Sequence, residues 1–275
     1  MKKLLLAIIA FSGVMTCAAQ DSTNTEKPDT IRVGGMIIIK KKGKDENGKK
    51  QKDVIITEHH RTKPSNISTN WWIVDIGFAN LNDKTNYGSA AAQAFAPGST
   101  KDQFDLRTGK SINVNIWFFM QRLNVVKHVV NLKYGLGLEL NNYRFDDERV
   151  RLSKNPTLIT IDPTLANVDK NKLAADYITV PMMLNFNFTP GRKKGFGLSA
   201  GMSAGYLYSS RQKIKDDGNK TKLHDNFDLR KWKLSYIGEL NLGPVRLYGS
   251  YALKSMWEKG LDQTPYNVGI RLSNW

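Results

Sequence analysis

Apolar and polar residues alternate at every second position over much of the chain from residue 69 onward. The clearest case covers residues 130–141. Its apolar positions are Val130, Leu132, Tyr134, Leu136, Leu138 and Leu140. A period of two is that of a β-strand, whose successive side chains point to opposite faces. At an apolar content of 40%, such a run is expected by chance about 0.05 times in a chain of this length. We therefore predict a two-faced strand.

Seven further segments repeat the pattern with more irregularity, beginning near residues 72, 112, 178, 196, 232, 245 and 266. The breaks between the eight segments measure about 30, 7, 30, 6, 18, 2 and 10 residues in chain order. Alternating long and short connections are typical of an up-and-down transmembrane β-barrel, which has short turns at one end and long loops at the other. A Greek-key sandwich has no reason to alternate in this way.

The segment lengths fit a membrane as well. Eleven residues at about 3.4 Å each give about 37 Å, and a tilt of about 45° reduces the height to about 26 Å, near that of the apolar band of such barrels. No run of about 20 apolar residues exists, which excludes a bundle of membrane helices. The fold class we predict is all-β, an eight-stranded antiparallel up-and-down transmembrane β-barrel over residues 69–275.

Outward-facing aromatic residues fall near the ends of the predicted strands. With both barrel termini in the periplasm, Trp72, Phe188 and Phe196 would lie at the periplasmic level. Phe78, Tyr206, Trp232 and Tyr266 would lie at the opposite level. We predict that these residues form two membrane-interface girdles. The alternative is the ordinary preference of aromatic residues for strands.

The inward faces carry charges of both signs. They are Asp75, Lys133, Glu139, Lys233, Glu239, Arg246, Lys254 and Arg271. Buried charges must be paired, and an eight-stranded barrel is narrow enough for side chains to fill it. We therefore predict a solid polar network in the barrel interior. A small gated conduit is the alternative.

Residues 176–185, Asp-Tyr-Ile-Thr-Val-Pro-Met-Met-Leu-Asn, include a proline within a predicted strand. Proline cannot donate to a strand ladder, so we predict a bulge or an unpaired carbonyl at Pro181, with a register shift as the alternative. This stretch resembles the Tyr-Leu-x-Ile-Pro-Leu-Leu-Leu-Lys-Tyr segment of Bacteroidota outer-membrane β-barrel proteins, the PorT-like family often labelled porin-family proteins.

The end of the sequence is similar to the assembly signal of outer-membrane barrels at Asn267, Gly269, Leu272 and Trp275. It departs from that pattern at Asn274, which occupies an expected apolar position. The resemblance covers roughly residues 69–275. It implies an outer-membrane location in a Gram-negative cell and suggests a link to the secretion and gliding machinery of these bacteria.

Residues 1–19 have the composition of a secretory signal peptide. Lys2 and Lys3 precede an apolar stretch over residues 4–15, and small residues follow. We expect cleavage after Ala19, which removes the only cysteine, Cys17. A short buried helix and a lipoprotein acylated at Cys17 are the alternatives, and residues 14–16 fit a lipoprotein signal poorly.

Residues 20–68 differ in composition from the barrel region. Two short apolar stretches, residues 30–40 and 53–60, flank a polar stretch and predict a periplasmic β-hairpin with a flexible tip. Including both strands would give a ten-stranded barrel, but the alternation there is poor, so we retain eight.

The chain is strongly basic, with 41 Lys and Arg against 25 Asp and Glu. Ten of these basic residues and four of the acidic ones lie between residues 32 and 63. Others lie in predicted turns, such as Arg192, Lys193 and Lys194. On an exported barrel we expect these charges to meet outer-membrane lipid and lipopolysaccharide phosphates, and not nucleic acid.

Residues suited to catalysis are few. The histidines are His59, His60, His128 and His224, none placed beside a serine and an acid as a lipid-modifying enzyme requires. His59 and His60 would point to opposite faces of a strand, which disfavours a metal site. We expect no enzyme and no cofactor. The sequence predicts a structural or accessory outer-membrane component with possible periplasmic or surface protein partners. A small gated pore, a lipocalin-like soluble barrel and, more weakly, a lipid-modifying enzyme are the alternatives.

Overall fold

The computed structural model describes residues 29–33, 36–41, 54–59, 65–190 and 195–273. It divides into two parts, Met1–Pro64 and Ser65–Trp275, which are treated separately below. The predicted signal peptide, the polar tip of the predicted hairpin and residues 192–194 lie outside the described residues. Within these ranges no helix is long and apolar enough to cross a bilayer.

The first part contains a small antiparallel sheet of three strands, in the order β1-β2-β3. The strands are β1 (Asp29–Val33), β2 (Met36–Lys41) and β3 (Val54–His59). The predicted hairpin is present, since β2 and β3 pair in antiparallel. Residues 30–40 form two strands and not the one expected, so β1 was not predicted. Val33 pairs with Met36, and the sequence between them is Gly-Gly, a pair favoured in two-residue hairpin connections.

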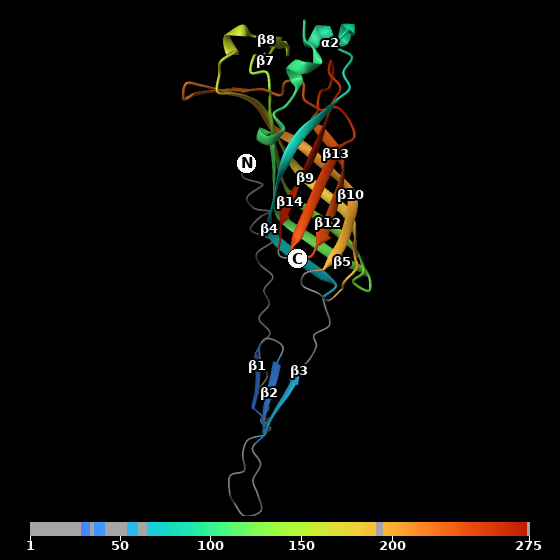
Figure 1. The fold of residues 1–275 in the computed structure, drawn as a ribbon. Coiled ribbons are helices and arrows are strands. Elements are labelled where there is room, and N and C mark those ends of the chain that lie inside the picture. The colour runs from blue at the N-terminus through green and yellow to red at the C-terminus, as the bar shows by residue number, and fades with distance from the viewer. Residues whose placement is uncertain (1–28, 34–35, 42–53, 60–64, 191–194, 274–275) are drawn as a thin grey trace, which may run out of the picture. The chain divides into compact units, whose positions relative to one another are not determined.

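The second part is built on eight antiparallel strands that close into a ring (Figure 1). They are β4 (Ile67–Asp83), β5 (Ile112–Val126), β6 (Val130–Arg144), β9 (Lys170–Asn187), β10 (Phe196–Asp216), β12 (Trp232–Leu242), β13 (Val245–Ala252) and β14 (Gln263–Leu272). Each strand pairs with the next, and β14 pairs with β4 to close the ring. The predicted eight-stranded up-and-down barrel is therefore confirmed. Among the described residues, β1–β3 pair only with one another, which argues against ten strands.

The two ends of the barrel differ in their connections. Short turns over residues 127–129, 188–195 and 243–244 lie at one end, called the turn end, where β4 begins and β14 finishes. Four longer connections, residues 84–111, 145–169, 217–231 and 253–262, lie at the other, called the loop end. They contain the short elements α2 (Ala90–Phe95), η1 (Lys101–Phe104), η2 (Thr108–Lys110), β7 (Val150–Leu152), β8 (Ile159–Ile161), η3 (Pro163–Leu165) and β11 (Asn219–His224).

Burial on the barrel wall is the reverse of that in a soluble protein. Along residues 130–141 of β6 the polar residues and glycines are buried and the apolar ones are half-exposed, in strict alternation. The neighbouring strands also expose large apolar side chains, among them Val180, Met182, Leu198, Leu234, Val268 and Ile270. An apolar outer wall around a polar interior is the arrangement of a transmembrane barrel.

Extra residues shift the register of the β5–β6 ladder at Phe118 and Val125 and of the β9–β10 ladder at Tyr208. Between β4 and β5, Trp72 and Phe118 lie opposite each other in a gap of the ladder with no change of register. Trp72 has a φ of 56°, and its ring meets the ring of Phe118 edge-on at 5.8 Å. The alternation of the two faces breaks at this gap, so Trp71 and Trp72 are both exposed while Ile73 is buried.

Pro181 causes no register shift. It stays paired with Ser203 on β10. On its other side, β6 and β9 keep one register, but the pairing skips Gly135 and Leu136, which face Pro181 and Val180. The structure shows neither the predicted bulge nor the alternative register shift at Pro181, and the locally unpaired carbonyl stays a prediction.

The four loop-end connections form a folded cap, defined here as residues 84–111, 145–169, 225–231 and 253–262. Phe95 packs against Trp257 with ring centroids 5.5 Å apart, and Phe104 stacks on Tyr87 at 5.7 Å. These and other cap side chains share one buried apolar cluster with the inward-facing barrel residues Tyr143 and Tyr177. The cap therefore fills the loop end of the barrel.

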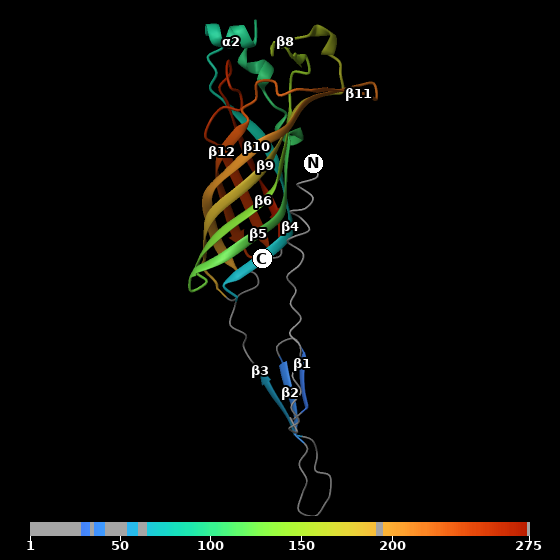
Figure 2. The same cartoon turned by 180° about the vertical axis from the view of Figure 1, so that it is seen from behind.

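β10 continues well past the cap junction and pairs with β11 and with the start of β9. This three-stranded extension, residues 170–175, 209–216 and 219–224, is called the arm. In Figures 1 and 2 its β10–β11 hairpin turns away from the barrel and extends sideways. The expectation of a loop here was wrong, because β10 is 21 residues long.

Candidate functional site: the charged core of the barrel

A cluster of charged side chains fills the middle of the barrel. We call it the charged core: Asp75 from β4, Lys133 and Glu139 from β6, Lys233 and Glu239 from β12 and Arg271 from β14. Each is buried to at least nine-tenths. All six lie at inward positions of their strands, because alternate residues of a barrel strand face the interior.

Arg271 links two of the three carboxylates. Its Nε lies 2.6 Å from Asp75 Oδ1 and its Nη2 lies 2.7 Å from Asp75 Oδ2, a bidentate pair. Its third nitrogen, Nη1, pairs with Glu239. The guanidinium lies 5.6 Å from the ring centroid of Trp117, whose indole N–H donates to Asp75 at 2.7 Å. Arg271 is thus held by two carboxylates and by one aromatic ring.

The two lysines complete the charge balance. Lys133 pairs with Glu239, and Lys233 pairs with Glu139. Lys233 also lies 4.6 Å from the ring centroid of Tyr177. Three carboxylates therefore face three cations, so the charged core has no net formal charge.

Amide and hydroxyl groups fill the space around these ion pairs. Asn267 donates to Glu139 at 3.1 Å, Asn113 donates to Asn141 at 2.9 Å, and Tyr248 donates to Asn113 at 2.5 Å. The cavity left beside Asp75 and Glu239 measures about 30 Å³, about the volume of one water molecule. The charged core therefore blocks the barrel interior.

The structure buries seven of the eight predicted inward charges in the barrel and brings six of them together in the charged core. The seventh, Arg246, is also buried and lies toward the turn end, where its guanidinium donates to the carbonyl of Ser273. The placement of Lys254 inside the barrel was wrong. β13 ends at Ala252, so Lys254 lies in a cap connection, where it is exposed.

The predicted girdle residues lie on the outer surface. Trp72, Phe188 and Phe196 are exposed near the turn end. Phe78, Tyr206 and Trp232 are exposed on the half of the wall nearer the loop end. Tyr266 is half-buried because it stacks on Tyr251. Their role at a membrane interface stays a prediction. The exposed Trp71 was not predicted as part of a girdle, because the alternation rule assigned it to the inner face.

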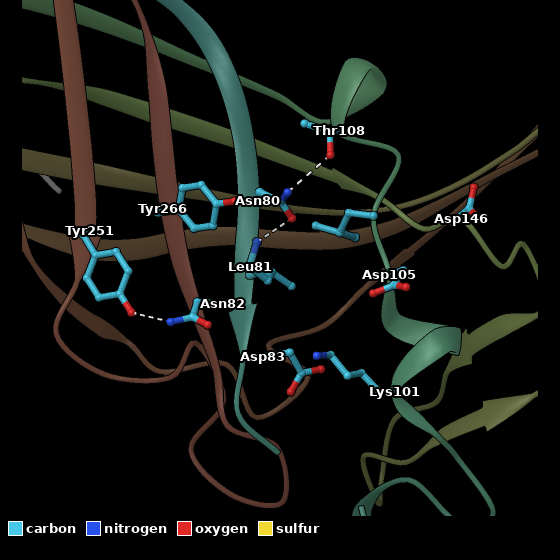
Figure 3. A pocket seen from close by; sticks show the side chains of 11 residues that line it. Asn80, Leu81, Asn82, Asp83, Lys101, Asp105, Thr108, Asp146, Tyr251 and Tyr266 are labelled. Carbon is cyan, nitrogen blue, oxygen red and sulfur yellow. Dashed lines mark hydrogen bonds between the residues drawn. The ribbon is translucent and has the colours of Figure 1, made fainter. Parts of the chain in front are cut away.

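A hollow lies outside the wall of the barrel part, between β4 and the cap (Figure 3). It measures about 800 Å³, and Asn80, Asn82, Tyr251, Lys101 and Asp105 are among its lining residues. Asn82 donates to the Tyr251 hydroxyl at 2.8 Å, and Asn80 donates to Thr108 at 3.3 Å. The groove is polar and carries charges of both signs.

Asp83 anchors the cap at one end of this groove. Its carboxylate accepts hydrogen bonds from Tyr87 at 2.6 Å and from Gln263 at 2.9 Å. Burial acts to raise the pKa of Asp83, but these hydrogen bonds and those from Thr85 outweigh it, and the pKa lies below its usual value. Burial and the bond to Asp83 raise the pKa of Tyr87. At neutral pH Asp83 is therefore ionised and Tyr87 neutral, and the contact between them is a charge-assisted hydrogen bond.

The described part of the chain contains no group of three or more side chains suited to hold a metal ion. In the charged core every carboxylate is bound to a cation. Such an arrangement holds strands together and excludes water.

Sequence reasoning missed the cap core and the arm. Aromatic residues in otherwise polar connections, Phe95, Phe104, Phe145, Phe227 and Trp257, could have indicated the cap. The arm carries the pattern Lys-x-Lys three times, at residues 170–172, 213–215 and 220–222, which also has the strand period.

A family match supports the fold. Residues 76–256 match the family described as "Outer membrane protein beta-barrel domain". Ail, the attachment invasion locus protein of Yersinia pestis, is a similar solved structure, with 10% identity and a TM-score of 0.30 over 74% of this chain and 98% of that one. No curated protein matches the chain. The narrower resemblance to the PorT-like proteins of Bacteroidota stays a prediction. Since the matched residues make up more than half of the sequence, the chain belongs to the outer membrane protein β-barrel domain family.

Proposed function

We propose that this protein is a non-enzymatic outer-membrane barrel that serves as a structural or accessory component of a cell-surface or secretion assembly. In this proposal both barrel ends of the chain lie in the periplasm and the cap lies on the cell surface. The observation that carries it is an interior blocked twice, by the charged core and by the cap. A barrel with no open path acts through its outer surfaces.

The charged core argues against the alternative of a small gated pore. Opening a path would require separating ion pairs such as Arg271–Asp75, in which both side chains are almost fully buried. Separating such a pair leaves uncompensated charge in a low-dielectric interior, which costs several kcal/mol. The cap would also have to leave its apolar contacts with the barrel.

The distribution of polarity argues against a lipocalin-like carrier. A soluble carrier of apolar ligands has an apolar interior and a polar exterior. Here Asn113, Asn131 and Asn185 are buried inside, while Leu184, Leu240 and Leu247 are exposed outside.

The orientation is tested by labelling single cysteines. The sequence contains one cysteine, Cys17, inside the predicted signal peptide, so introduced cysteines give a clean readout. We expect Lys154→Cys, in the cap, to react with a membrane-impermeant maleimide on intact cells. Val126→Cys, at the turn end, should react only after the outer membrane is permeabilised. The reverse pattern would contradict the proposed orientation.

Two measurements test the proposed task. Planar-bilayer recordings should show no stepwise conductance, and steps on the nanosiemens scale would overturn the proposal of a closed barrel. Crosslinking in native outer membranes should place the protein in a complex larger than the monomer. A protein that remains monomeric after crosslinking would contradict an accessory role.

A further inference from the structure

Six lysines form a regular array on one face of the arm. Lys213 of β10 lies opposite Lys172 of β9 and Lys222 of β11. Lys215 of β10 lies opposite Lys170 and Lys220 in the same way. Because all six side chains stand at alternate positions of paired strands, they share one face. We call these two rows of three residues the lysine face.

Such an array is unfavourable unless it meets negative charge. Like charges directly opposite each other on neighbouring strands destabilise a sheet. Burial first, and then Lys170, Lys213 and Arg211, lower the pKa of Lys172 to about 8. Burial, Arg211 and Lys222 likewise lower the pKa of Lys213. Both lysines belong to the arm, beyond the membrane-spanning wall.

Few counter-charges relieve this repulsion. Within the described part of the chain, one lysine of the array has a carboxylate partner, since Lys215 lies 2.8 Å from Asp169. Lys172 donates to the neutral side chain of Asn142 at 2.5 Å. Asp176, the other nearby acid, is paired with Arg211 at 2.5 Å. The lysine face therefore carries a net positive charge.

The opposite face of the arm is occupied by the cap. Gln212 donates to the carbonyl of Val150 at 2.9 Å and accepts from the backbone N–H of Leu152 at 3.0 Å. Gln212 and Asn171 are almost fully buried there. The lysine face thus points away from the cap. On β9, Lys172 and the exposed wall residue Ile178 are six positions apart, so their side chains point to the same side of the strand.

The bend of the arm gives this face its direction. The lysines continue the outer, apolar side of the barrel wall, and in Figures 1 and 2 the β10–β11 hairpin turns outward from the loop end. When a wall strand bends outward, its outer face lies on the inside of the bend. The lysine face therefore turns toward the membrane around the barrel.

The height of the array also suits the headgroup layer. Six residues of strand span about 20 Å, or about 14 Å of height at a tilt of about 45°. Lys172 thus lies above the apolar belt and not within it. A hollow of about 310 Å³, lined by the six lysines with Ile214 and Thr221, opens on this face.

We propose that the lysine face is a docking surface for the phosphate groups of outer-leaflet lipid headgroups, so that the arm rests on the membrane surface. This inference rests on the proposed function for its choice of leaflet. Continuity with the lipid-facing wall favours a membrane lipid over a soluble polyanion. Each lysine near an anionic membrane surface raises binding about fivefold, so the array acts as a strong multivalent contact.

The test compares two triple variants of the full chain in detergent micelles. Lys172→Gln/Lys213→Gln/Lys222→Gln removes one row of the lysine face. Lys84→Gln/Lys110→Gln/Lys154→Gln removes the same charge from exposed cap positions. Heat-modifiable gel migration checks that both variants fold. Binding of diphosphoryl lipid A and of its dephosphorylated form is measured by native mass spectrometry.

We expect the unaltered protein and the cap variant to bind the diphosphoryl form more than about tenfold better than the dephosphorylated form. The row variant should lose that preference. Equal preference in all three proteins would overturn the proposal. A second result would also overturn the proposal. In nanodiscs, heparin, a soluble polyanion, would bind the lysine face equally well whether or not the bilayer contains diphosphoryl lipid A, which would mean that the membrane does not occupy the face.

These outcomes are separable from those of the proposed function. Phosphate binding in micelles does not depend on orientation in the cell, so reversed cysteine labelling would refute the orientation and leave phosphate binding intact. Conversely, a failed lipid test leaves the closed barrel and its cap unaffected.

Discussion

Replacing Arg271 by methionine tests whether the charged core acts as one balanced unit. The substitution keeps a long side chain beside Trp117 but removes two bonds to Asp75 and one to Glu239. Glu239 retains Lys133 as a partner. Asp75 retains only neutral donors, Trp117 at 2.7 Å and Asn115 at 3.2 Å.

The expected loss follows from the burial of the pair. Side chains of Arg271 and Asp75 are 6% and 0% exposed, so the remaining carboxylate has no access to water. Removing one partner of a buried ion pair costs about 3–5 kcal/mol. The unfolding equilibrium constant should therefore rise about 100- to 4000-fold. Asp75→Asn combined with Arg271→Met leaves two acids and two lysines in balance, and should recover at least about 1.5 kcal/mol of the loss.

The assay is urea unfolding of protein inserted into phosphatidylcholine vesicles. Tryptophan fluorescence and heat-modifiable gel migration report the transition, and coincident unfolding and refolding curves establish equilibrium. Lys254→Met, at the exposed cap lysine, is the control and should change stability by less than about 0.5 kcal/mol. The reasoning fails if Arg271→Met costs less than about 1 kcal/mol, or if the double variant shows no recovery.

Three further predictions follow from other parts of the molecule. Gly269→Ala places a Cβ 2.3 Å from the Ile76 carbonyl oxygen and 2.4 Å from Gly77 Cα, so it should destabilise the β14–β4 closure by about 1–3 kcal/mol in the same urea assay. Gly238→Ala, where the nearest atom lies 3.8 Å away, should be far milder, and equal losses would refute the steric argument. Gln212→Leu removes the partner of the Leu152 N–H and of the Asn171 side-chain oxygen, while the Val150 carbonyl keeps its bond from Asn171. Each lost partner costs about 1–3 kcal/mol, so limited proteolysis should cut residues 145–169 faster while barrel migration stays normal. Unchanged cleavage would count against this link. Binding of diphosphoryl lipid A should fall as pH rises from 7 to 9, because the pKa of Lys172 is about 8 and its positive charge is lost above that value. The charged groups that surround Lys172 are Lys170, Lys213, Arg211, Lys222 and Asp176. Lys172→Arg should make the fall smaller, and a fall of the same size in that variant would exclude Lys172 as its cause.

The barrel wall could be predicted from the sequence because one rule governs it. The barrel has lipid on the outside and polar groups on the inside. The position of a residue in the alternating strand therefore determines whether its side chain points outward or inward. That rule places Asp75, Glu139 and Arg271 inside correctly without any knowledge of their partners. The alternation rule fails at Lys254 because this residue lies beyond the end of β13. In a loop, position in the sequence does not determine whether a side chain points inward or outward.

The cap and the arm could not be predicted in the same way. The cap core joins Phe95, Phe145, Phe227 and Trp257 from four separate connections, and no local periodicity encodes contacts between loops. The arm was expected to be loop because both of its faces are polar, and the apolar contrast that reveals a wall strand is missing. At Trp72 the positive φ and the gap in the ladder, where Trp71 turns outward, leave no mark in the composition of the strand.

The cap core also sets an order on assembly. Its apolar cluster draws side chains from all four loop-end connections. In the proposed orientation, with the cap on the cell surface, the cluster can therefore close only after the last connection, residues 253–262, has crossed the membrane. Each connection must therefore cross the bilayer before it takes its final shape, and long apolar side chains such as Trp257 are unburied during that passage. Once the cluster has formed, pulling any hairpin back would expose the shared aromatic core. Formation of the cap core therefore makes insertion of the barrel hard to reverse.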